Sequence, residues 1–163
     1  MSIPVKIESL GPSVVEKVVQ LELASGLSSI GTALYAAKLE DPRELLLVAR
    51  PLENPDLIAA LFSAVIIIDE LQIDNIAVDR SFRGRGIAGH LLKVALRAAF
   101  DRGARTAVLE VRRSNLPAIR LYRSSGFSVV GSRPAYYRNP DEDALIMSAS
   151  LDFETDGSKS MDR

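Results

Sequence analysis

The stretch from Leu71 to Ser125 constrains the fold of this chain more than any other part. A run rich in β-branched residues, 71–78, leads into a loop with two glycines, 83–88 (RGRGIA). Beyond the loop, apolar residues recur with the spacing of one helical face, at Ile87, Leu91, Ala95 and Ala99. A glycine loop that opens a helix presents free backbone N–H groups beside the positive end of the helix dipole. The stretch therefore predicts a strand, loop and helix that hold a phosphorylated ligand.

Strand and helix patterns flank this unit on both sides. Alternating or continuous apolar runs predict strands at 3–8, 44–50, 57–68, 71–78, 106–111, 127–131 and 144–151. Helical spacing, caps and closing glycines predict helices over 12–25, 29–39, 87–102 and 116–124. Only Asp69 and Glu70 separate the third strand from the fourth, so these two strands are expected to form an antiparallel hairpin. We therefore predict a mixed α/β (α+β) fold with a central, mostly antiparallel sheet of six to seven strands, flanked by about four helices.

The length of 163 residues, without a linker or an internal repeat, predicts one domain over residues 1–152. Residues 153–163 are polar and are expected to form a disordered tail. The proline-containing segment 134–143 is expected to be a loop that carries Tyr136 and Tyr137.

Composition excludes several classes of chemistry. The chain has no cysteine, which rules out disulfides, a thiol nucleophile and cysteine-ligated metals, and its single histidine argues against a histidine-based metal site or triad. The N-terminus lacks the pattern of a signal peptide, and no apolar run reaches the roughly 20 residues of a membrane helix. We therefore expect a cytoplasmic protein that needs no metal and does not bind a membrane.

The net charge is −1, but the charge is unevenly distributed. Residues 80–123 contain eleven Lys or Arg side chains, and their only acids are Asp101 and Glu110. Solvated helix faces would explain such a pattern. A basic surface for a polyanionic ligand explains it as well and is the interpretation favoured here. Because the remainder of the chain is acidic, we expect no binding to nucleic acid.

The glycine loop can be read in two frames. Residues 84–89 fit the dinucleotide-binding pattern G-x-G-x-x-G, and Glu110 lies near the position of a ribose-binding acid. However, five residues separate Val78 from the first glycine, whereas the dinucleotide pattern places that glycine almost directly after its strand. The preceding strand is also the second arm of a hairpin, and Arg83 and Arg85 add charge that a backbone-only turn does not require.

In the second frame, Arg83-x-x-Gly86-x-Ala88 resembles the (Gln/Arg)-x-x-Gly-x-(Gly/Ala) motif of the GNAT superfamily of acyl-CoA-dependent N-acetyltransferases. Other segments are similar to its ribosomal-protein alanine N-acetyltransferase branch, namely 75–79, 109–112, 114–115, 118–122, 126–127 and 136–147. The resemblance covers about residues 70–150. It implies the GNAT fold and the transfer of an acetyl group from acetyl-CoA to a protein or peptide amine, in particular an N-terminal α-amine. Without a cysteine to carry the acetyl group, transfer would be direct, in a ternary complex.

The resemblance also implies roles for individual residues. Glu110 would act as the general base through water, and Tyr122 as the general acid toward the leaving sulfur. A free α-amine has a pKa of roughly 7.7–8.0, so a weak base suffices. Backbone groups would pair with pantetheine, while the arginines and loop N–H groups would hold pyrophosphate. The cofactor contacts would come from Ile76, Ala77, Val78, Arg83, Gly84, Arg85, Gly86, Ile87, Ala88, Gly89 and Asn115.

The acceptor is less constrained. Tyr136 and Tyr137 match tyrosines that line the acceptor site in this branch. The chain has no tryptophan, so it lacks the Phe-Pro-Trp element that shapes the acceptor groove there, and residues 25–29 occupy the corresponding region. A ribosomal protein, another protein N-terminus, a lysine side chain or a small amine remain possible acceptors. Two alternatives stay open: a small-molecule amine acetyltransferase, and a non-catalytic regulatory domain that binds CoA or a nucleotide. The oligomeric state is left open.

Overall fold

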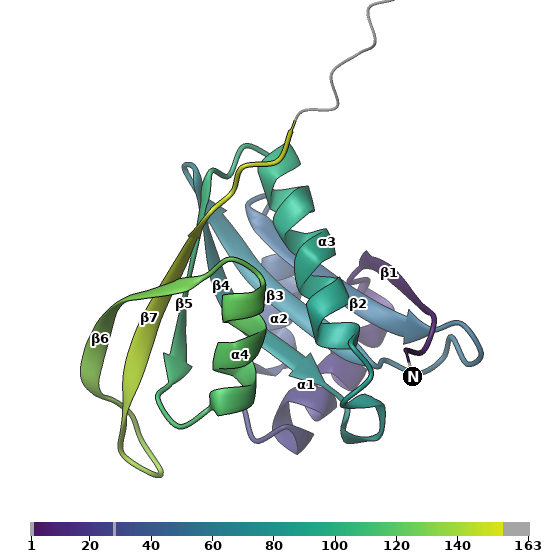
Figure 1. Cartoon of the computed structure of the whole chain (residues 1–163). Coiled ribbons are helices and arrows are strands. Elements are labelled where there is room, and N and C mark those ends of the chain that lie inside the picture. The colour runs from purple at the N-terminus through teal and green to yellow at the C-terminus, as the bar shows by residue number, and fades with distance from the viewer. Residues whose placement is uncertain (1, 28, 155–163) are drawn as a thin grey trace, which may run out of the picture.

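The computed structural model describes residues 2–27 and 29–154, which form a sheet with helices on both faces (Figure 1). In this part of the chain the strands are β1 (Val5–Ser9), β2 (Glu44–Pro51), β3 (Ala60–Ile67), β4 (Glu70–Val78), β5 (Thr106–Arg112), β6 (Ser128–Tyr137) and β7 (Glu142–Ser150). The helices are α1 (Val15–Ala24), α2 (Gly31–Leu39), α3 (Ile87–Asp101) and α4 (Leu116–Ser124), and short 3-10 turns form at Pro12–Val14 and Arg80–Phe82. The order of strands and helices predicted from the sequence is confirmed.

The strand order in the sheet is β1-β2-β3-β4-β5-β7-β6. Only β4 and β5 run parallel, and the other neighbouring strands are antiparallel. The hairpin predicted from the short link at Asp69 and Glu70 is confirmed, because β3 and β4 pair antiparallel across it. The prediction of a mixed, mostly antiparallel sheet is therefore also confirmed.

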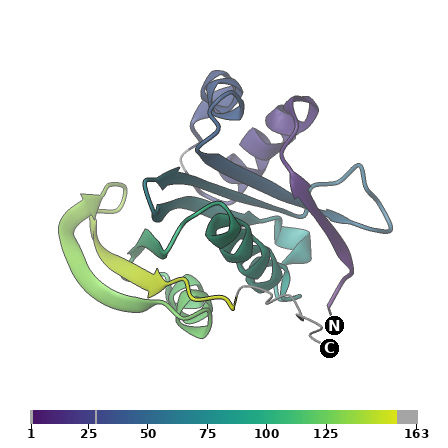
Figure 2. The ribbon, with the colours of Figure 1, turned by 90° about the horizontal axis from the view of Figure 1, so that it is seen from above.

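The two sheet faces are covered by different helices. Figure 2 shows α1 and α2 on one face and α3 and α4 on the other. The core on the α3 side includes Phe62, Leu71 and Leu109, whereas the core on the α1 side includes Val18 and Leu61. Because successive side chains of a strand point to opposite faces, each strand at the centre contributes to both layers.

Strands β4 and β5 separate part of the way along their length. They pair only from Glu70 with Thr106 to Ile73 with Leu109, although β4 continues to Val78. On its other side, β4 has an extra residue at the same point, because the register with β3 shifts around Asp74. Such a bulge bends a strand and increases its twist, which accounts for the separation of β4 from its parallel neighbour.

The expected loop at 134–143 is wrong, because β6 continues through Tyr136 to Tyr137 and the turn comes after it. The sequence predicts a strand that ends at Gly131 and a loop from Pro134, because proline removes a ladder hydrogen bond. Strand β6 lies at the edge of the sheet, where proline is tolerated, and its register with β7 is irregular between Arg133 and Tyr137.

The C-terminal boundary also differs from the expectation. Phe153, which we assigned to the disordered tail, packs its ring against Phe100 of α3 with centroids 5.4 Å apart. The remainder of the predicted tail, 155–163, lies outside the described residues. Within the described ranges, no helix has both the length and the apolar character needed to cross a membrane.

Candidate active site

A cleft of about 600 Å³ lies where β4 has parted from β5. Its walls are the end of β4, the loop before α3, the first turns of α4 and the segment after α1. Ten of the eleven predicted cofactor contacts line it: Ile76, Ala77, Val78, Arg83, Gly84, Gly86, Ile87, Ala88, Gly89 and Asn115. The eleventh, Arg85, lines a separate cavity beside the N-terminal segment together with His90. The fold thus brings nearly the whole predicted set together.

The glycine loop has the geometry of an anion site. Gly84 and Gly86 have φ angles of 73° and 76°, a left-handed conformation that glycine adopts without steric cost. Gly86 is the N-cap of α3 and provides no side-chain cap, so the first N–H groups of this helix have no capping side chain. With the helix dipole, these N–H groups favour a phosphate at this end of the cleft.

The free edge of β4 offers a second kind of contact. After Ile73, β4 pairs with β3 on one side, and no other strand of the described chain pairs with its remaining edge. An extended ligand with amide groups can add to such an edge as a strand would. One group is already engaged, since Arg83 Nε donates to the Val78 carbonyl at 3.1 Å and so ties the loop to the strand end.

Asn115 sits at the far wall of the cleft and caps α4. Its side-chain oxygen accepts from the Ala118 N–H at 3.3 Å, and a proline follows in the first turn. An asparagine followed closely by proline is a sequence signal of a helix start, and the structure has the N-cap at this position.

Glu110 does not line the cleft, because it faces the other side of the sheet. Its neighbours Leu109 and Val111 belong to the core under α3, and alternation along β5 turns Glu110 toward the opposite layer. There its Oε1 atom lies 2.9 Å from Nε of Arg133. A hydrogen bond with Glu110 raises the pKa of Tyr136. The predicted base is therefore held from β6, across the sheet from the cofactor cleft.

Tyr122 lies on the cleft side of the sheet, in the core between α4 and β5. Its side chain is 8% exposed and its ring packs against Phe127 at a centroid distance of 5.7 Å. Burial raises the pKa of Tyr122 to about 12. Its hydroxyl has no hydrogen-bond partner among residues 2–27 and 29–154. The group is therefore protonated at neutral pH and free to donate a hydrogen bond.

The two tyrosines predicted for the acceptor site, Tyr136 and Tyr137, lie near both Glu110 and Tyr122. The rings of Tyr136 and Tyr137 are perpendicular at 5.0 Å, and the Arg112 guanidinium lies 4.4 Å from the Tyr137 ring centroid. Burial raises the pKa of Tyr137. Tyr136 thus contacts Glu110, while Tyr137 lies near enough to Tyr122 to add to the rise of its pKa.

The sequence did not single out several residues of this region. Pro117, Ala118 and Leu121 line the cleft. Their positions in the first turns of the helix after Asn115 could have indicated that they lie beside it. Arg133 had no such signal, because its contact with Glu110 depends on β7 lying between β5 and β6.

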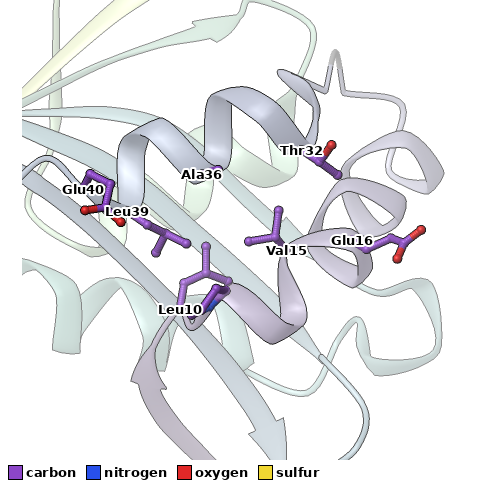
Figure 3. A pocket seen from close by; sticks show the side chains of 8 residues that line it. Leu10, Val15, Glu16, Thr32, Ala36, Leu39 and Glu40 are labelled. Carbon is purple, nitrogen blue, oxygen red and sulfur yellow. The ribbon is translucent and has the colours of Figure 1, made fainter.

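A separate cleft of about 570 Å³ lies between the start of α1 and α2. Figure 3 shows Leu10, Val15 and Leu39 along it, with Glu16 and Glu40 at its two ends. It contains none of the predicted site residues. In the described part of the chain, no three His, Cys, Asp or Glu side chains are grouped as metal ligands.

Comparison with known proteins identifies the family. The model of the acetyltransferase (GNAT) family matches residues 16–127, which include the glycine loop. A Bacillus subtilis relative that bears the name of a ribosomal protein bS18-alanine N-acetyltransferase is 36% identical over 135 residues, or 82% of this chain and 87% of its own. The enzyme of that name from Salmonella typhimurium is 41% identical over 98 residues, 59% of this chain and 66% of its own.

A solved structure gives the same answer for the fold. The crystal structure of the ribosomal-protein-S18-alanine N-acetyltransferase from Escherichia coli superimposes with a TM-score of 0.82 at 28% identity, over 94% of this chain and 98% of the other. The chain therefore belongs to the GNAT family of acetyltransferases and is an enzyme that takes its acetyl group from acetyl-CoA.

Proposed function

We propose that this enzyme acetylates the N-terminal α-amine of a protein or peptide by direct transfer from acetyl-CoA in a ternary complex. The observation that carries the proposal is the gap between β4 and β5. The cofactor cleft opens on the gap from the α3 side, and Glu110 faces the other side with Tyr136 beside it. A thioester in the gap would be accessible to an amine from the face opposite the cofactor.

The cofactor would lie along the cleft in an extended form. Its pyrophosphate would bind the N–H groups from Gly84 to Gly89 at the start of α3, with Arg83 of the cleft wall supplying positive charge. Arg85, which lines the neighbouring cavity, would add to the positive charge of the loop. Its pantetheine amides would pair with the free edge of β4 at Ile76 and Ala77. Asn115 closes the opposite wall.

The transfer would then need two proton movements. The neutral amine nitrogen attacks the thioester carbon, the new C–N bond forms, and the C–S bond breaks. A proton from the amine passes through water to Glu110, and Tyr122 donates its proton to the departing sulfur. An N-terminal α-amine suits this arrangement because a fraction of the amine molecules is already neutral near pH 7.

For the acceptor we propose a peptide that begins with alanine, as in the ribosomal protein named in the relatives. Tyr136 and Tyr137 would contact its first residues. Direct transfer is favoured because the chain has no cysteine to carry an acetyl group. The cytoplasmic location and the single domain over residues 1–152 stay predictions.

The test uses peptides with and without a free α-amine. The purified protein is incubated with acetyl-CoA and a peptide that begins with alanine and has an internal lysine, and mass spectrometry locates the acetyl group. The control is the same peptide with its N-terminus already blocked. We expect acetylation of the free α-amine only. Modification of the lysine in both peptides, or of small amines but neither peptide, would overturn the proposal.

A further inference from the structure

A buried carboxyl group lies in the layer between α1, α2 and the sheet. Glu22 of α1 is only 1% exposed. Its Oε1 atom accepts a hydrogen bond from the Tyr35 hydroxyl at 2.6 Å and another from Asn75 Nδ2 at 3.1 Å. Tyr35 is fully buried, and burial together with Glu22 raises its pKa, so the hydroxyl remains a donor. Burying a carboxyl group lowers stability unless the group is hydrogen-bonded. A buried carboxyl group beside the site therefore indicates a functional role for this cluster.

Two polar atoms in and beside the cluster lack a hydrogen-bond partner. In the described residues, the buried side-chain atoms without a hydrogen-bond partner are Glu22 Oε2 and Ser25 Oγ. The two residues are three positions apart, so they lie on one side of α1. Ser25 lines the cofactor cleft. The end of α1 therefore contains unpartnered buried polar atoms next to the cleft.

Asn75 links this cluster to the gap between the strands. It follows the bulge at Asp74, on the part of β4 that no longer pairs with β5. Its bond to Glu22 places its side chain on the α1 face, the face toward which Glu110 points from β5. Asn75 and Glu110 thus stand on the two strands that border the gap, on the acceptor side.

The bond to Glu22 also determines the orientation of the Asn75 amide. A carboxyl acceptor takes the NH₂ group, so the carbonyl oxygen is turned away from Glu22. Oδ1 of Asn75 has no hydrogen-bond partner in the described part of the chain. It is not among the buried atoms that lack a partner, so it is also not sealed from solvent. An accessible acceptor with a fixed orientation is therefore present beside the gap.

We propose that Oδ1 of Asn75 accepts an N–H hydrogen bond from the attacking amine, and that Glu22 and Tyr35 are positioning residues that hold the Asn75 amide in this orientation. The inference deepens the proposed function by assigning a residue that recognises the acceptor nitrogen. A neutral primary amine has two N–H bonds and one lone pair. If Asn75 holds one N–H and the water on Glu110 takes the other proton, the lone pair is aimed at the thioester carbon. Asn75 takes no proton.

The test isolates this one hydrogen bond with two ligands of nearly equal shape. S-carboxamidomethyl-CoA carries an NH₂ group beside the position of the attacking nitrogen, one methylene farther from the sulfur, and S-acetonyl-CoA carries a methyl group in place of that NH₂. Calorimetric titration gives the ratio of their dissociation constants. We expect the wild-type protein to prefer the amide ligand by about 3- to 10-fold, the effect of one neutral hydrogen bond.

The variants distinguish the hydrogen bond made by Asn75 from the positioning role of Glu22. Asn75→Ala should reduce the preference to about 1-fold, and Glu22→Gln should reduce it in part while S-acetonyl-CoA still binds at the wild-type level. The matched control is Ser63→Ala, which removes another buried polar group from the same region, one bonded to Asp74 instead. Ser63→Ala should keep the preference. Thermal unfolding of each variant checks that it is folded.

Two results would overturn the inference: no preference in the wild-type protein, or a preference that survives Asn75→Ala. If Asn75→Ala does not fold, Glu22→Gln and the wild-type ratio still decide the question. Because the two ligands contain no peptide, their ratio is independent of which amine is the natural acceptor. Failure of the peptide assay with a normal ligand preference would therefore refute only the proposed acceptor.

Discussion

Gly86 offers a quantitative test of how the glycine loop is built. Its φ of 76° is left-handed, and a Cβ at this position would meet nothing within 4 Å. Replacing it by alanine therefore adds backbone strain without a clash, and for an L-residue this strain is about 1–2 kcal/mol. Alanine also reduces the entropy of the unfolded chain, which returns about 0.4–1 kcal/mol.

Gly11 provides the matched control for this substitution. Its φ is −100°, and a Cβ there would also meet nothing within 4 Å. The gain from the unfolded chain is the same for both alanine variants, so the difference between them isolates the strain. We expect Gly86→Ala to be less stable than Gly11→Ala by about 1–2 kcal/mol, or roughly 2–8 °C in Tm. Urea and thermal unfolding measure this, and equal stability of the two variants would refute the reasoning.

Three further predictions concern the cap and two titrating groups. Asn115→Ala should lower the free energy of unfolding by about 1 kcal/mol, whereas Asn115→Ser keeps a capping oxygen and most of the stability. Calorimetric titration with acetyl-CoA tests the second role of this residue: if both variants bind acetyl-CoA more weakly, the Asn115 amide contacts the ligand. Burial raises the pKa of Tyr122 to about 12, so the contribution of its protonated hydroxyl to stability is complete below pH 10 and is lost as the pH rises toward 12. In unfolding experiments, Tyr122→Phe should reduce this alkaline loss of stability by about 2–3 kcal/mol. Hydrogen bonds from Ser114, together with the charge of Arg112, lower the pKa of Glu142. The contribution of the Glu142 carboxylate to stability is therefore present above its ordinary pKa and is lost as the pH falls through the lowered pKa. Glu142→Gln should make Tm less dependent on pH below about pH 4.5.

Local patterns predicted much of the fold. The four-residue spacing from Ile87 to Ala99 and the glycines before it predicted α3 and the loop at its start, because helix period and left-handed turns are properties of adjacent residues. The short link predicted at Asp69 and Glu70 indicated the β3–β4 hairpin for the same reason, although in the structure the two linking residues are Ile68 and Asp69. Most of the cleft was predictable because its walls lie largely within one strand–loop–helix unit and the start of the next helix. The wall formed by Ser25 and Leu27 was not, because these residues are far from that unit in the sequence.

The acceptor side depends on contacts between distant segments. The bond from Asn75 to Glu22 joins residues 53 positions apart, and the ion pair of Arg133 with Glu110 requires β7 to lie between their strands. The bulge at Asp74 depends on pairing with β3, which hydrophobic alternation alone does not reveal. The loop predicted from Pro134 is wrong because the effect of a proline on a strand depends on whether that strand lies at an edge of the sheet.

The central claim is that the donor binds in the cleft on one face of the sheet while Glu110 faces the other, so that donor binding and chemistry are separable. The most direct measurement compares wild-type protein with the Glu110→Gln/Tyr122→Phe double variant, using acetyl-CoA titration and acetyl transfer to the peptide that begins with alanine. The account predicts that the Kd for acetyl-CoA changes by no more than about twofold while transfer falls at least about 100-fold, as expected when general acid and base are lost. Transfer at the wild-type rate, or an equal loss of acetyl-CoA binding and transfer, would contradict it.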